Sequence, residues 1–482
     1  MIQNHGVFVG ANDTSEIRHI YEDIFTKFES RIEQKIPVGE FDIPASITEI
    51  IPAIRMILST EKLVTLRVRN NQLISHFASS REAAAKIRGP FTPDNIVYCK
   101  SQHLYCDAEG SATDVIAELK KQINEFTQEY SYTPRVILVK GMGLIAVGEN
   151  AEGADTILDV FEDKMNISWL SESFGGPHFM TDEQIEFIDS WEVENYRRKI
   201  TAEDGSSGRA ADRVIIVTGG AKGFGEGIVR GLHAQGANIL IADIDSELGE
   251  DLAESLNARG GKNQVRSFRT DVSDSKSLQD LMKETVKWFG GLDAFISNAG
   301  ILHAGGLDEM DEETFDRVTR INYNAYFYGT KYASRIMKLQ QDTGSASHYS
   351  DIIQINSKSG LSGSKKNFAY AGGKFGGIGL TQSFALELAP HKIKVNSVCP
   401  GNFFEGPLWS DPDTGLFVQY LNTGKVPGAK NIEEVRAHYE KQVPLGRGCR
   451  VEDVLKAIFY IMEQEYETGQ AIPVTGGQIM LS

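Results

Sequence analysis

The sequence has few cysteines and no long apolar run. Its four cysteines, Cys99, Cys106, Cys399 and Cys449, are scattered and none forms a CxxC pair, so a disulfide framework is not expected. No uninterrupted apolar stretch approaches the roughly 18 residues that a membrane span needs, and the first residues lack the pattern of a signal peptide. These absences predict a protein of the reducing cytoplasm with no membrane partner.

Positive charge is also scarce. The 482 residues include 49 Lys and Arg against 66 Asp and Glu, a formal net charge of −17. Because nucleic-acid phosphates are bound by clustered positive charge, this balance argues against a nucleic-acid partner. A small anionic substrate needs only a local group of basic residues and stays open.

The length exceeds the usual size of one hydrophobic core, so two domains are expected. Polar and small residues interrupt the apolar periodicity between Tyr196 and Arg213, which predicts a linker between domains 1–200 and 209–482. In the first domain, amphipathic helical stretches at 14–32 and 112–130 alternate with short β-rich runs. Those runs are at 6–10, 63–68, 94–99 and 135–148. They predict an α/β domain.

The second domain has a regular alternation of apolar strands and helices. The strands are expected within 213–220, 238–245, 292–300, 349–357 and 393–401. This rhythm predicts a doubly wound parallel sheet of the Rossmann type.

The first of these strands runs into a glycine-rich turn that opens a helix. The turn, TGGAKGFG, contains Thr218, Gly219, Gly223, Phe224 and Gly225. Its glycines permit a tight turn and let a pyrophosphate approach the backbone N–H groups of the helix N-terminus. An ordinary turn is the alternative for such a pattern alone, but the strand before it and the helix after it favour a dinucleotide site.

Acidic residues after the next two strands bear on which dinucleotide binds. Asp243 ends the second strand about 20 residues beyond the glycines, where a carboxylate accepts the ribose hydroxyls of NAD and repels a 2′-phosphate. Lys222 is an opposing cue, because a lysine in the glycine loop could pair with the 2′-phosphate of NADP. NAD is the prediction. Asp271, beside Val272, is placed to contact adenine, with a helix N-cap role as the alternative.

Tyr370 and Lys374 stand one helical turn apart in the segment YAGGK. Hydride transfer between a secondary alcohol and nicotinamide requires a group that takes or supplies the hydroxyl proton, and a free tyrosine with a pKa of about 10 is too weak a base. An ammonium on the same face favours the phenolate. Tyr370 is therefore predicted to be the acid/base, with Lys374 as its partner and as a ribose ligand. An exposed pair on an amphipathic helix is the alternative for an isolated YxxxK.

A serine before this helix is predicted to bind the substrate oxygen. Ser357 lies thirteen residues before Tyr370, at the end of an apolar strand. Its hydroxyl would orient the substrate and stabilise developing charge. Ser359 is the rival hydroxyl.

Together TGGAKGFG, the segment Ser297-Asn298-Ala299-Gly300, the Ser357 segment and YAGGK resemble the short-chain dehydrogenase/reductase family across residues 209–482. The resemblance implies a Rossmann-type subunit in a homo-oligomer, a dimer or a tetramer, and its spacing points to Ser357 rather than Ser359.

The same resemblance implies a Tyr-Lys-Ser-Asn tetrad. Its fourth member would be Asn322, 24 residues past Asn298, holding a water linked to the lysine. Asn324 is the structural alternative. Asn298 itself is expected to tie adjacent strands together, with Ala299 and Gly300 beside the cofactor.

The sequence departs from the family pattern after Pro400 and Gly401. Family members commonly carry a threonine there that binds the nicotinamide carboxamide, whereas this chain continues NFFEGP. Backbone groups or Asn402 are the candidates for that contact.

Segments around the site also resemble the sorbitol-6-phosphate 2-dehydrogenases of this family. The matching stretches are at 352–389, 442–449 and 468–480. The implied reaction converts D-sorbitol 6-phosphate and NAD to D-fructose 6-phosphate and NADH.

Basic residues near Tyr370 are compatible with a phosphorylated substrate. Lys358 and Lys365 are predicted to bind the phosphate, with Lys366 and Arg447 as further candidates. A solvated loop is the alternative for any one of the lysines. The long stretch 406–443 is expected to form a substrate lid.

Two other functions compete with this one. Spacing alone supports only a secondary alcohol or ketone, so an unphosphorylated polyol is one alternative substrate. A dinucleotide-binding regulator or scaffold is an alternative of another class, disfavoured because pure binding needs neither Tyr370 nor Lys374.

Four segments of the first domain, at 2–13, 90–100, 134–148 and 189–199, resemble the C-terminal portion of class II aldolase/adducin domains, in particular those fused to short-chain dehydrogenases. His5 matches the third metal ligand of such aldolases, but the chain starts too late for their HxH pair. Since a catalytic zinc needs three protein ligands and His103 and His178 lack HxH spacing, neither a metal nor aldolase activity is predicted. Four roles stay open for the domain: a remnant that packs on the dehydrogenase, a partner-binding module, part of a split protein, or part of a truncated one.

Overall fold

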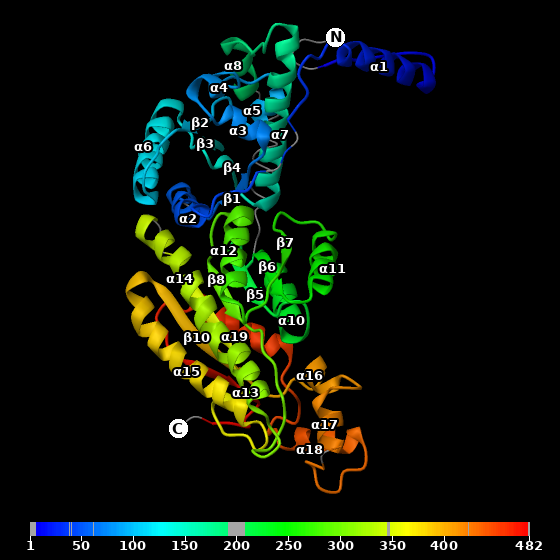
Figure 1. The fold of residues 1–482 in the computed structure, drawn as a ribbon, viewed down its shortest axis with the longest axis vertical. Coiled ribbons are helices and arrows are strands. Elements are labelled where there is room, and N and C mark those ends of the chain that lie inside the picture. Colours follow the sequence, from blue (N-terminus) through cyan, green and yellow to red (C-terminus); the bar gives the residue numbers. More distant parts are fainter. Residues whose placement is uncertain are drawn as a thin grey trace. The chain divides into compact units, whose positions relative to one another are not determined.

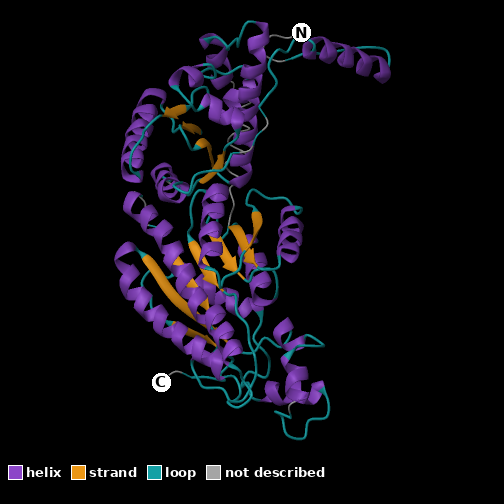
Figure 2. Cartoon of the chain, in the orientation of Figure 1, coloured by secondary structure: helices purple, strands orange, loops and turns teal. Residues whose placement is uncertain are grey.

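The computed structural model describes residues 6–37, 39, 41–60, 62–190, 208–344, 348–422 and 424–480. The chain divides into two compact units, Met1–Gly205 and Ser206–Ser482. Both units combine helices and strands (Figures 1 and 2), so the expected α/β class is confirmed. His5 lies outside the described residues.

The first unit contains a four-stranded sheet of order β1-β4-β3-β2. Strand β4 pairs antiparallel with β1 and β3, whereas β2 pairs parallel with β3. Its strands are β1 (Thr65–Arg69), β2 (Leu104–Cys106), β3 (Val136–Val139) and β4 (Gly143–Gly148). Its helices are α1 (Thr14–Glu29), α2 (Ile47–Leu58), α3 (Gln72–Phe77), α4 (Arg81–Ala85), α5 (Pro93–Cys99), α6 (Ala112–Tyr130), α7 (Ala151–Ser171), the 3₁₀ turn η1 (Glu172–Phe174) and α8 (Asp182–Ser190).

Two of the strands expected in this unit are absent. The run 6–10 has only a single bridge residue, at Gly6. The run 94–99 lies within helix α5, because Thr92 and Asn95 form a reciprocal capping box and Pro93 occupies the first helical turn. Those capping interactions satisfy the free backbone groups of a helix start and override the β-rich composition.

The second unit contains a seven-stranded sheet of order β11-β10-β9-β8-β5-β6-β7 in which every pairing is parallel. This confirms the doubly wound parallel sheet. Its strands are β5 (Val214–Thr218), β6 (Asn238–Asp243), β7 (Val265–Arg269), β8 (Ala294–Ser297), β9 (Ser350–Ile355), β10 (Ile393–Pro400) and β11 (Ala471–Val474). The strand order changes direction between β5 and β8, and ligands of such sheets bind at the carboxyl edge beside that point.

Helices cover the sheet of the second unit in two groups. Helix α12 packs on α14 and α14 on α15, while α10 packs on α19 (Figure 1). The helices are α10 (Gly223–His233), α11 (Ser246–Asn257), α12 (Ser275–Phe289), α13 (Glu312–Thr319), α14 (Ala325–Thr343), α15 (Phe368–Leu388) and α19 (Val451–Glu463), with a π-helical turn η2 (Arg320–Asn324) and 3₁₀ turns η3 (Lys358–Gly360) and η4 (Ala389–His391).

The segment expected to form a lid contains three short helices, α16 (Pro407–Ser410), α17 (Leu416–Asn422) and α18 (Ile432–Lys441). Their apolar side chains form a cluster of their own. It includes Phe404, Trp409, Phe417, Tyr420 and Val435. This separate core lets the segment hold a defined shape beside the sheet.

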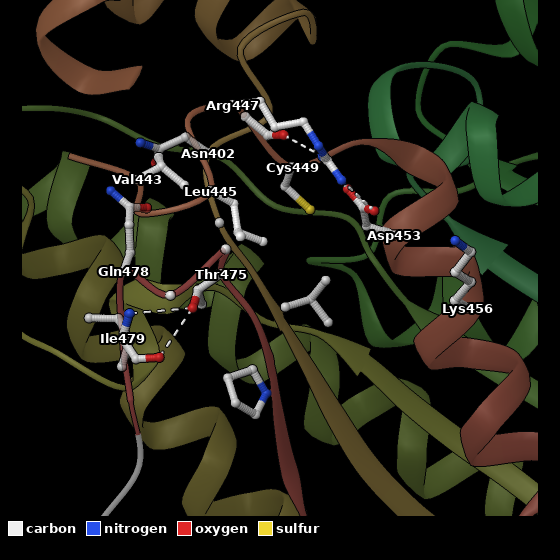
Figure 3. Close-up of a pocket in the computed structure, with 16 residues that line it drawn as sticks. Asn402, Val443, Leu445, Arg447, Cys449, Asp453, Lys456, Thr475, Gln478 and Ile479 are labelled. Carbon is white, nitrogen blue, oxygen red and sulfur yellow. Dashed lines mark hydrogen bonds and ion pairs between the residues drawn. The ribbon is translucent and has the colours of Figure 1, made fainter. Parts of the chain in front are cut away.

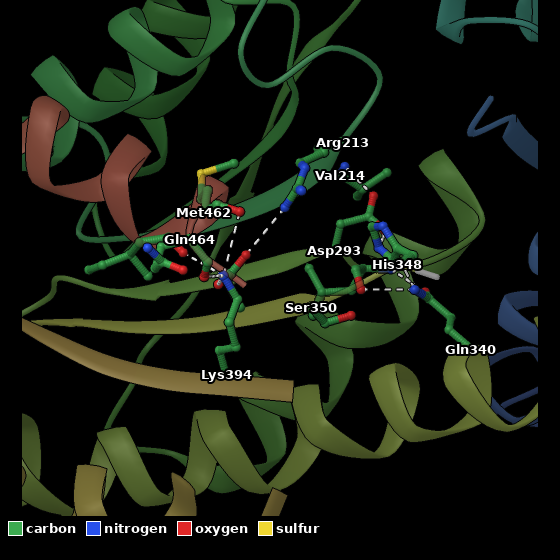
Figure 4. A network of polar contacts seen from close by, with 12 residues as sticks. Arg213, Val214, Asp293, Gln340, His348, Ser350, Lys394, Met462 and Gln464 are labelled. Atoms are coloured by element: carbon green, nitrogen blue, oxygen red, sulfur yellow. Dashed lines mark hydrogen bonds and ion pairs between the residues drawn. The ribbon is translucent and has the colours of Figure 1, made fainter. Parts of the chain in front are cut away.

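A buried polar network lies at the amino ends of the central strands (Figure 4). The ammonium of Lys394 is 3.0 Å from the carboxylate of Asp351, which Arg213 also approaches at 3.2 Å. Asp293 accepts the backbone N–H of Val214 at 2.7 Å. Burial raises the pKa of Asp351 and the two nearby cations oppose that rise. The charged groups at the amino edge of the sheet thus pair with one another and stabilise the fold. The candidate site lies at the opposite, carboxyl edge.

Candidate active site

The glycine-rich turn joins β5 to α10, and its backbone is packed too tightly for a side chain at Gly219 and Gly225. Gly223 has a φ of +63°, which favours glycine, and a Cβ at Gly225 would lie only 1.9 Å from the carbonyl oxygen of Gly219. Helix α10 begins at Gly223, so its free N–H groups open onto this turn. The bare backbone and the helix terminus fit the pyrophosphate of a dinucleotide.

Hydrogen bonds between Thr218 at the end of β5 and Asn298 just after β8 hold the ends of these two strands together. The amide of Asn298 donates to the carbonyl oxygens of Thr218 at 3.0 Å and Gly219 at 2.9 Å. The backbone N–H groups of Asn298 and Ala299 both donate to the Thr218 hydroxyl, at 3.0 and 3.1 Å. Asn298 therefore stabilises the backbone conformation at the start of the glycine-rich turn.

The carboxylate of Asp243 lies at the end of β6 and is 6% exposed. It accepts the N–H of Ala221 at 3.0 Å and that of Asp245 at 3.1 Å. These bonds orient the carboxylate between the glycine turn and the start of α11. Lys222 immediately precedes α10, and its side chain is exposed.

Asp271 and Val272 follow β7 and are partly buried. The Asp271 carboxylate accepts the N–H and the hydroxyl of Ser273, at 2.9 and 2.7 Å. Helix α12 begins at Ser275 and is capped by Asp274. The alternative role of Asp271 as a helix N-cap is therefore wrong, because its oxygen is engaged in a turn before the helix.

Tyr370 and Lys374 both lie in α15, near its amino end. The Lys374 ammonium is 5.6 Å from the centre of the Tyr370 ring and donates to the carbonyl oxygen of Ile355 at 2.8 Å. Burial lowers the pKa of Lys374 to about 8. Burial also raises the pKa of Tyr370, and a hydrogen-bonding interaction with Ser357 works in the opposite direction.

Ser357 follows β9 and caps the short turn η3. Its hydroxyl oxygen accepts the N–H of Ser359 at 3.1 Å. Since Ser357 interacts with the Tyr370 hydroxyl and Lys374 binds the neighbouring Ile355, the structure brings Ser357, Tyr370 and Lys374 together. Ser359, the rival hydroxyl, lies two residues further along the chain, within η3.

Asn322 occupies a π-helical turn between α13 and α14, a local irregularity that is common at functional sites. Its side chain accepts the N–H of Ile301 at 2.9 Å and donates to the Ile301 carbonyl oxygen at 2.7 Å. A Cβ at Gly373 would lie 3.3 Å from the Cβ of Asn322, and one at Gly300 only 2.9 Å from its amide oxygen. Asn322 thus fixes the loop after β8 beside α15, while Asn324 ends the same turn.

The chain after β10 borders a cavity of about 390 Å³ (Figure 3). Pro400 ends the strand, and the N–H of Gly401 donates to the Val474 carbonyl oxygen at 2.9 Å. Asn402 lines this cavity and is 8% exposed, and its amide nitrogen has no hydrogen-bond partner among the described residues. A buried donor without a partner is costly, which marks it as available to a ligand.

The basic residues near the site differ in their surroundings. Lys358 donates to the side-chain oxygen of Gln478 at 3.2 Å, Lys366 binds Glu309 at 3.0 Å, and Lys365 is exposed. Arg447 forms two hydrogen bonds with Asp453, at 2.6 and 3.0 Å (Figure 3), so its charge is balanced.

Lys425, which follows α17 in the segment expected to form a lid, also belongs to this group, since its positive charge lowers the pKa of Lys358. The sequence motifs did not indicate it, because β10 and two lid helices separate it from the catalytic segment and no local pattern marks it.

Among the described residues of the first unit, no comparable constellation is found. Burial lowers the pKa of His103 well below its usual value, and His178 is exposed. Across the part of the chain that the structure describes, no three His, Cys, Asp or Glu residues are grouped to hold a metal ion. No described helix is long and apolar enough to span a membrane.

Two protein-family models match the chain. Short chain dehydrogenase matches residues 213–408, and aldolase class II, second domain, matches residues 45–197. Uncharacterized oxidoreductase YuxG of Bacillus subtilis (strain 168) is 25% identical over 467 residues, covering 92% of this chain and 65% of that protein. The match to YuxG spans both units, which supports a fused architecture.

Two sorbitol-6-phosphate 2-dehydrogenases match the second unit. The protein of Escherichia coli (strain K12) is 36% identical over 272 residues, covering 56% of this chain and 99% of that protein. The crystal structure of SrlD from Erwinia amylovora superposes with a TM-score of 0.51 at 35% identity, covering 56% of this chain and 100% of that one. With its parallel sheet, its glycine turn and these relatives, the chain belongs to the short-chain dehydrogenase/reductase family and carries a class II aldolase-like domain ahead of it.

Proposed function

We propose that the chain is an NAD-dependent dehydrogenase that interconverts a sugar-alcohol phosphate and a ketose phosphate, with D-sorbitol 6-phosphate and D-fructose 6-phosphate as the leading pair. The observation that carries this proposal is the meeting of Ser357, Tyr370 and Lys374 at the carboxyl edge of the sheet. The likeness of the second unit to two sorbitol-6-phosphate 2-dehydrogenases supports the choice of substrate.

The cofactor would be held by the glycine turn and by polar groups along the same edge. Bound NAD supplies the acceptor for the hydride. Asp243 supports NAD over NADP, because its oriented carboxylate would accept ribose hydroxyls and repel a 2′-phosphate. Asp271, Val272, Ala299 and Gly300 would line the cofactor along this edge, and Pro400 and Gly401 would lie beside the nicotinamide.

Tyr370 would take the proton of the substrate hydroxyl during oxidation and return it during reduction. Ser357 would donate a hydrogen bond to the same oxygen and thereby orient it. Lys374, close to the Tyr370 ring, would favour the phenolate through its positive charge and would bind the ribose. Asn322 would act as a positioning residue, since its amide fixes the loop at Ile301.

The test is a comparison of initial rates with NAD and NADP across D-sorbitol 6-phosphate, free sorbitol and other polyol phosphates. The proposal expects the highest kcat/KM with NAD and the phosphorylated hexitol. Equal kcat/KM for sorbitol and its 6-phosphate would contradict the phosphate assignment, and absence of NAD reduction with every alcohol would contradict the dehydrogenase.

We also propose that the protein is a homo-oligomer of the reducing cytoplasm. Helices α14 and α15 carry exposed apolar side chains at Phe327, Phe375 and Leu386, which a second copy would cover. The four cysteines are free and buried, which supports a reducing compartment. Sizing by light scattering would test the assembly, and a monomer at micromolar concentration would contradict it.

A further inference from the structure

Three lysines from separate segments lie close enough for their charges to interact, Lys425 with Lys358 and Lys366 with Lys425. Lys358 follows Ser357, Lys366 precedes α15, and Lys425 follows α17 in the lid. Within the described residues, the one carboxylate in a salt bridge with any of them is Glu309, which binds Lys366. Lys358 and Lys425 therefore keep their positive charges without an acidic partner.

The surroundings of Lys358 and Lys425 destabilise the charged form of both side chains. Burial and the nearby charge of Lys425 lower the pKa of Lys358 to about 8. Burial and the charge of Lys366 lower the pKa of Lys425. Two like charges drawn together and partly removed from water destabilise a protein unless a ligand compensates them. An anion between them would do so.

The position of Lys425 is linked to the catalytic helix. Its ammonium lies 3.9 Å from the centre of the Tyr420 ring, a cation–π contact. The Tyr420 hydroxyl accepts a hydrogen bond at 3.3 Å from the amide of Asn367, the residue that caps α15. Tyr370 lies three residues later, so the lid lysine is held at a defined place relative to the acid/base.

We propose that Lys358 and Lys425 together form the subsite for the phosphate of the substrate, and that the lid supplies Lys425 when it covers the site. This inference rests on the proposed polyol phosphate dehydrogenase and names the residues that select the phosphate. A phosphate monoester carries up to two negative charges near neutrality and has three acceptor oxygens, so it matches two ammonium donors.

The test compares Lys425→Gln with Lys430→Gln, which removes the same charge from an exposed lysine of the same lid. Lys425→Gln is expected to raise the KM for D-sorbitol 6-phosphate at least tenfold and to change the KM for NAD less than twofold. Inorganic phosphate should compete with the substrate in the wild-type enzyme, with an inhibition constant that rises about as much in Lys425→Gln. Lys425→Arg should recover most of the loss, whereas Lys430→Gln should behave as wild type.

The test separates a wrong phosphate subsite from a wrong proposed function. If the wild-type enzyme turns over the phosphorylated hexitol but Lys425→Gln leaves both its KM and the phosphate inhibition within twofold, the subsite is elsewhere and the proposed function stands. If the wild-type enzyme uses no polyol phosphate, both proposals are wrong. Should Lys425→Gln not fold, loss of phosphate competition in Lys358→Gln decides the question, and unchanged competition there overturns the subsite.

Discussion

The ammonium of Lys374 lies 5.6 Å from the centre of the Tyr370 ring while it donates to the carbonyl oxygen of Ile355. The lysine is thus fixed by the backbone of β9 rather than by an acidic side chain, and its positive charge remains available to the tyrosine. Burial is the main cause that raises the pKa of Tyr370, and the nearby Cys399 and Tyr420 add to the rise. Without cofactor the tyrosine is therefore protonated at neutral pH, the form that serves ketone reduction.

This protonation state predicts opposite pH profiles for the two directions. Alcohol oxidation requires deprotonated Tyr370, so its kcat/KM should rise with pH, whereas kcat/KM for ketone reduction should fall at alkaline pH as the proton is lost. Lys374→Met removes the charge that favours the phenolate, so the rising limb of the oxidation profile should move to higher pH. Initial rates across the pH range, in both directions, measure this. An unshifted limb in the variant would show that Lys374 does not act on Tyr370 electrostatically.

Cofactor choice should depend on two residues of opposite charge. Asp243→Asn removes the charge that repels a 2′-phosphate, and we expect it to raise the ratio of kcat/KM for NADP over NAD about tenfold or more. Lys222→Gln should lower the use of NADP and leave NAD unaffected. Steady-state kinetics with each cofactor test both variants. A wild-type preference for NADP, or an Asp243→Asn enzyme with unchanged preference, would refute the assignment.

Asn402 is expected to contact the nicotinamide carboxamide. Its amide nitrogen has no partner among the described groups, so a ligand acceptor would gain a hydrogen bond of about 0.5–1.5 kcal/mol. Asn402→Ala should therefore weaken NAD binding about two- to tenfold, measured by fluorescence titration. If the variant binds NAD as tightly as wild type does, backbone groups make the contact instead.

The buried pair at the opposite edge of the sheet should govern stability rather than catalysis. Lys394→Met leaves the fully buried carboxylate of Asp351 with less compensation, and breaking such a pair costs about 3–5 kcal/mol. Chemical denaturation of the second unit should show this loss, while the exposed control Lys441→Met should stay within about 0.5 kcal/mol of wild type. A Lys394→Met protein of wild-type stability would mean that Asp351 is neutral in the folded state.

The sequence predicted the second unit well because its strands are short apolar runs and its turns carry residues with local physical roles. The apolar run 214–217 predicts the strand before the glycines, and the helical pattern of 225–236 predicts the helix after them. The first unit was harder: the run 94–99 has a strand-like composition, yet the cap at Thr92 and Pro93 makes it helical.

Long-range neighbours could not be predicted. The charges of Lys425 and Lys358 interact, although a strand and three helices, β10 with α15, α16 and α17, separate the two residues along the chain. No spacing rule links residues so far apart in sequence. Local hydrogen bonding also decided between roles: Asp274 rather than Asp271 caps α12, since the carboxylate of Asp271 is already bonded to Ser273.

The most direct test of the catalytic assignment is Tyr370→Phe, which removes one hydroxyl and preserves the ring. With NAD and D-sorbitol 6-phosphate, the account predicts a fall in kcat of at least about a hundredfold, because general acid/base catalysis contributes factors of that size, with NAD affinity and the unfolding midpoint close to wild type. Retention of wild-type kcat by Tyr370→Phe would contradict the account.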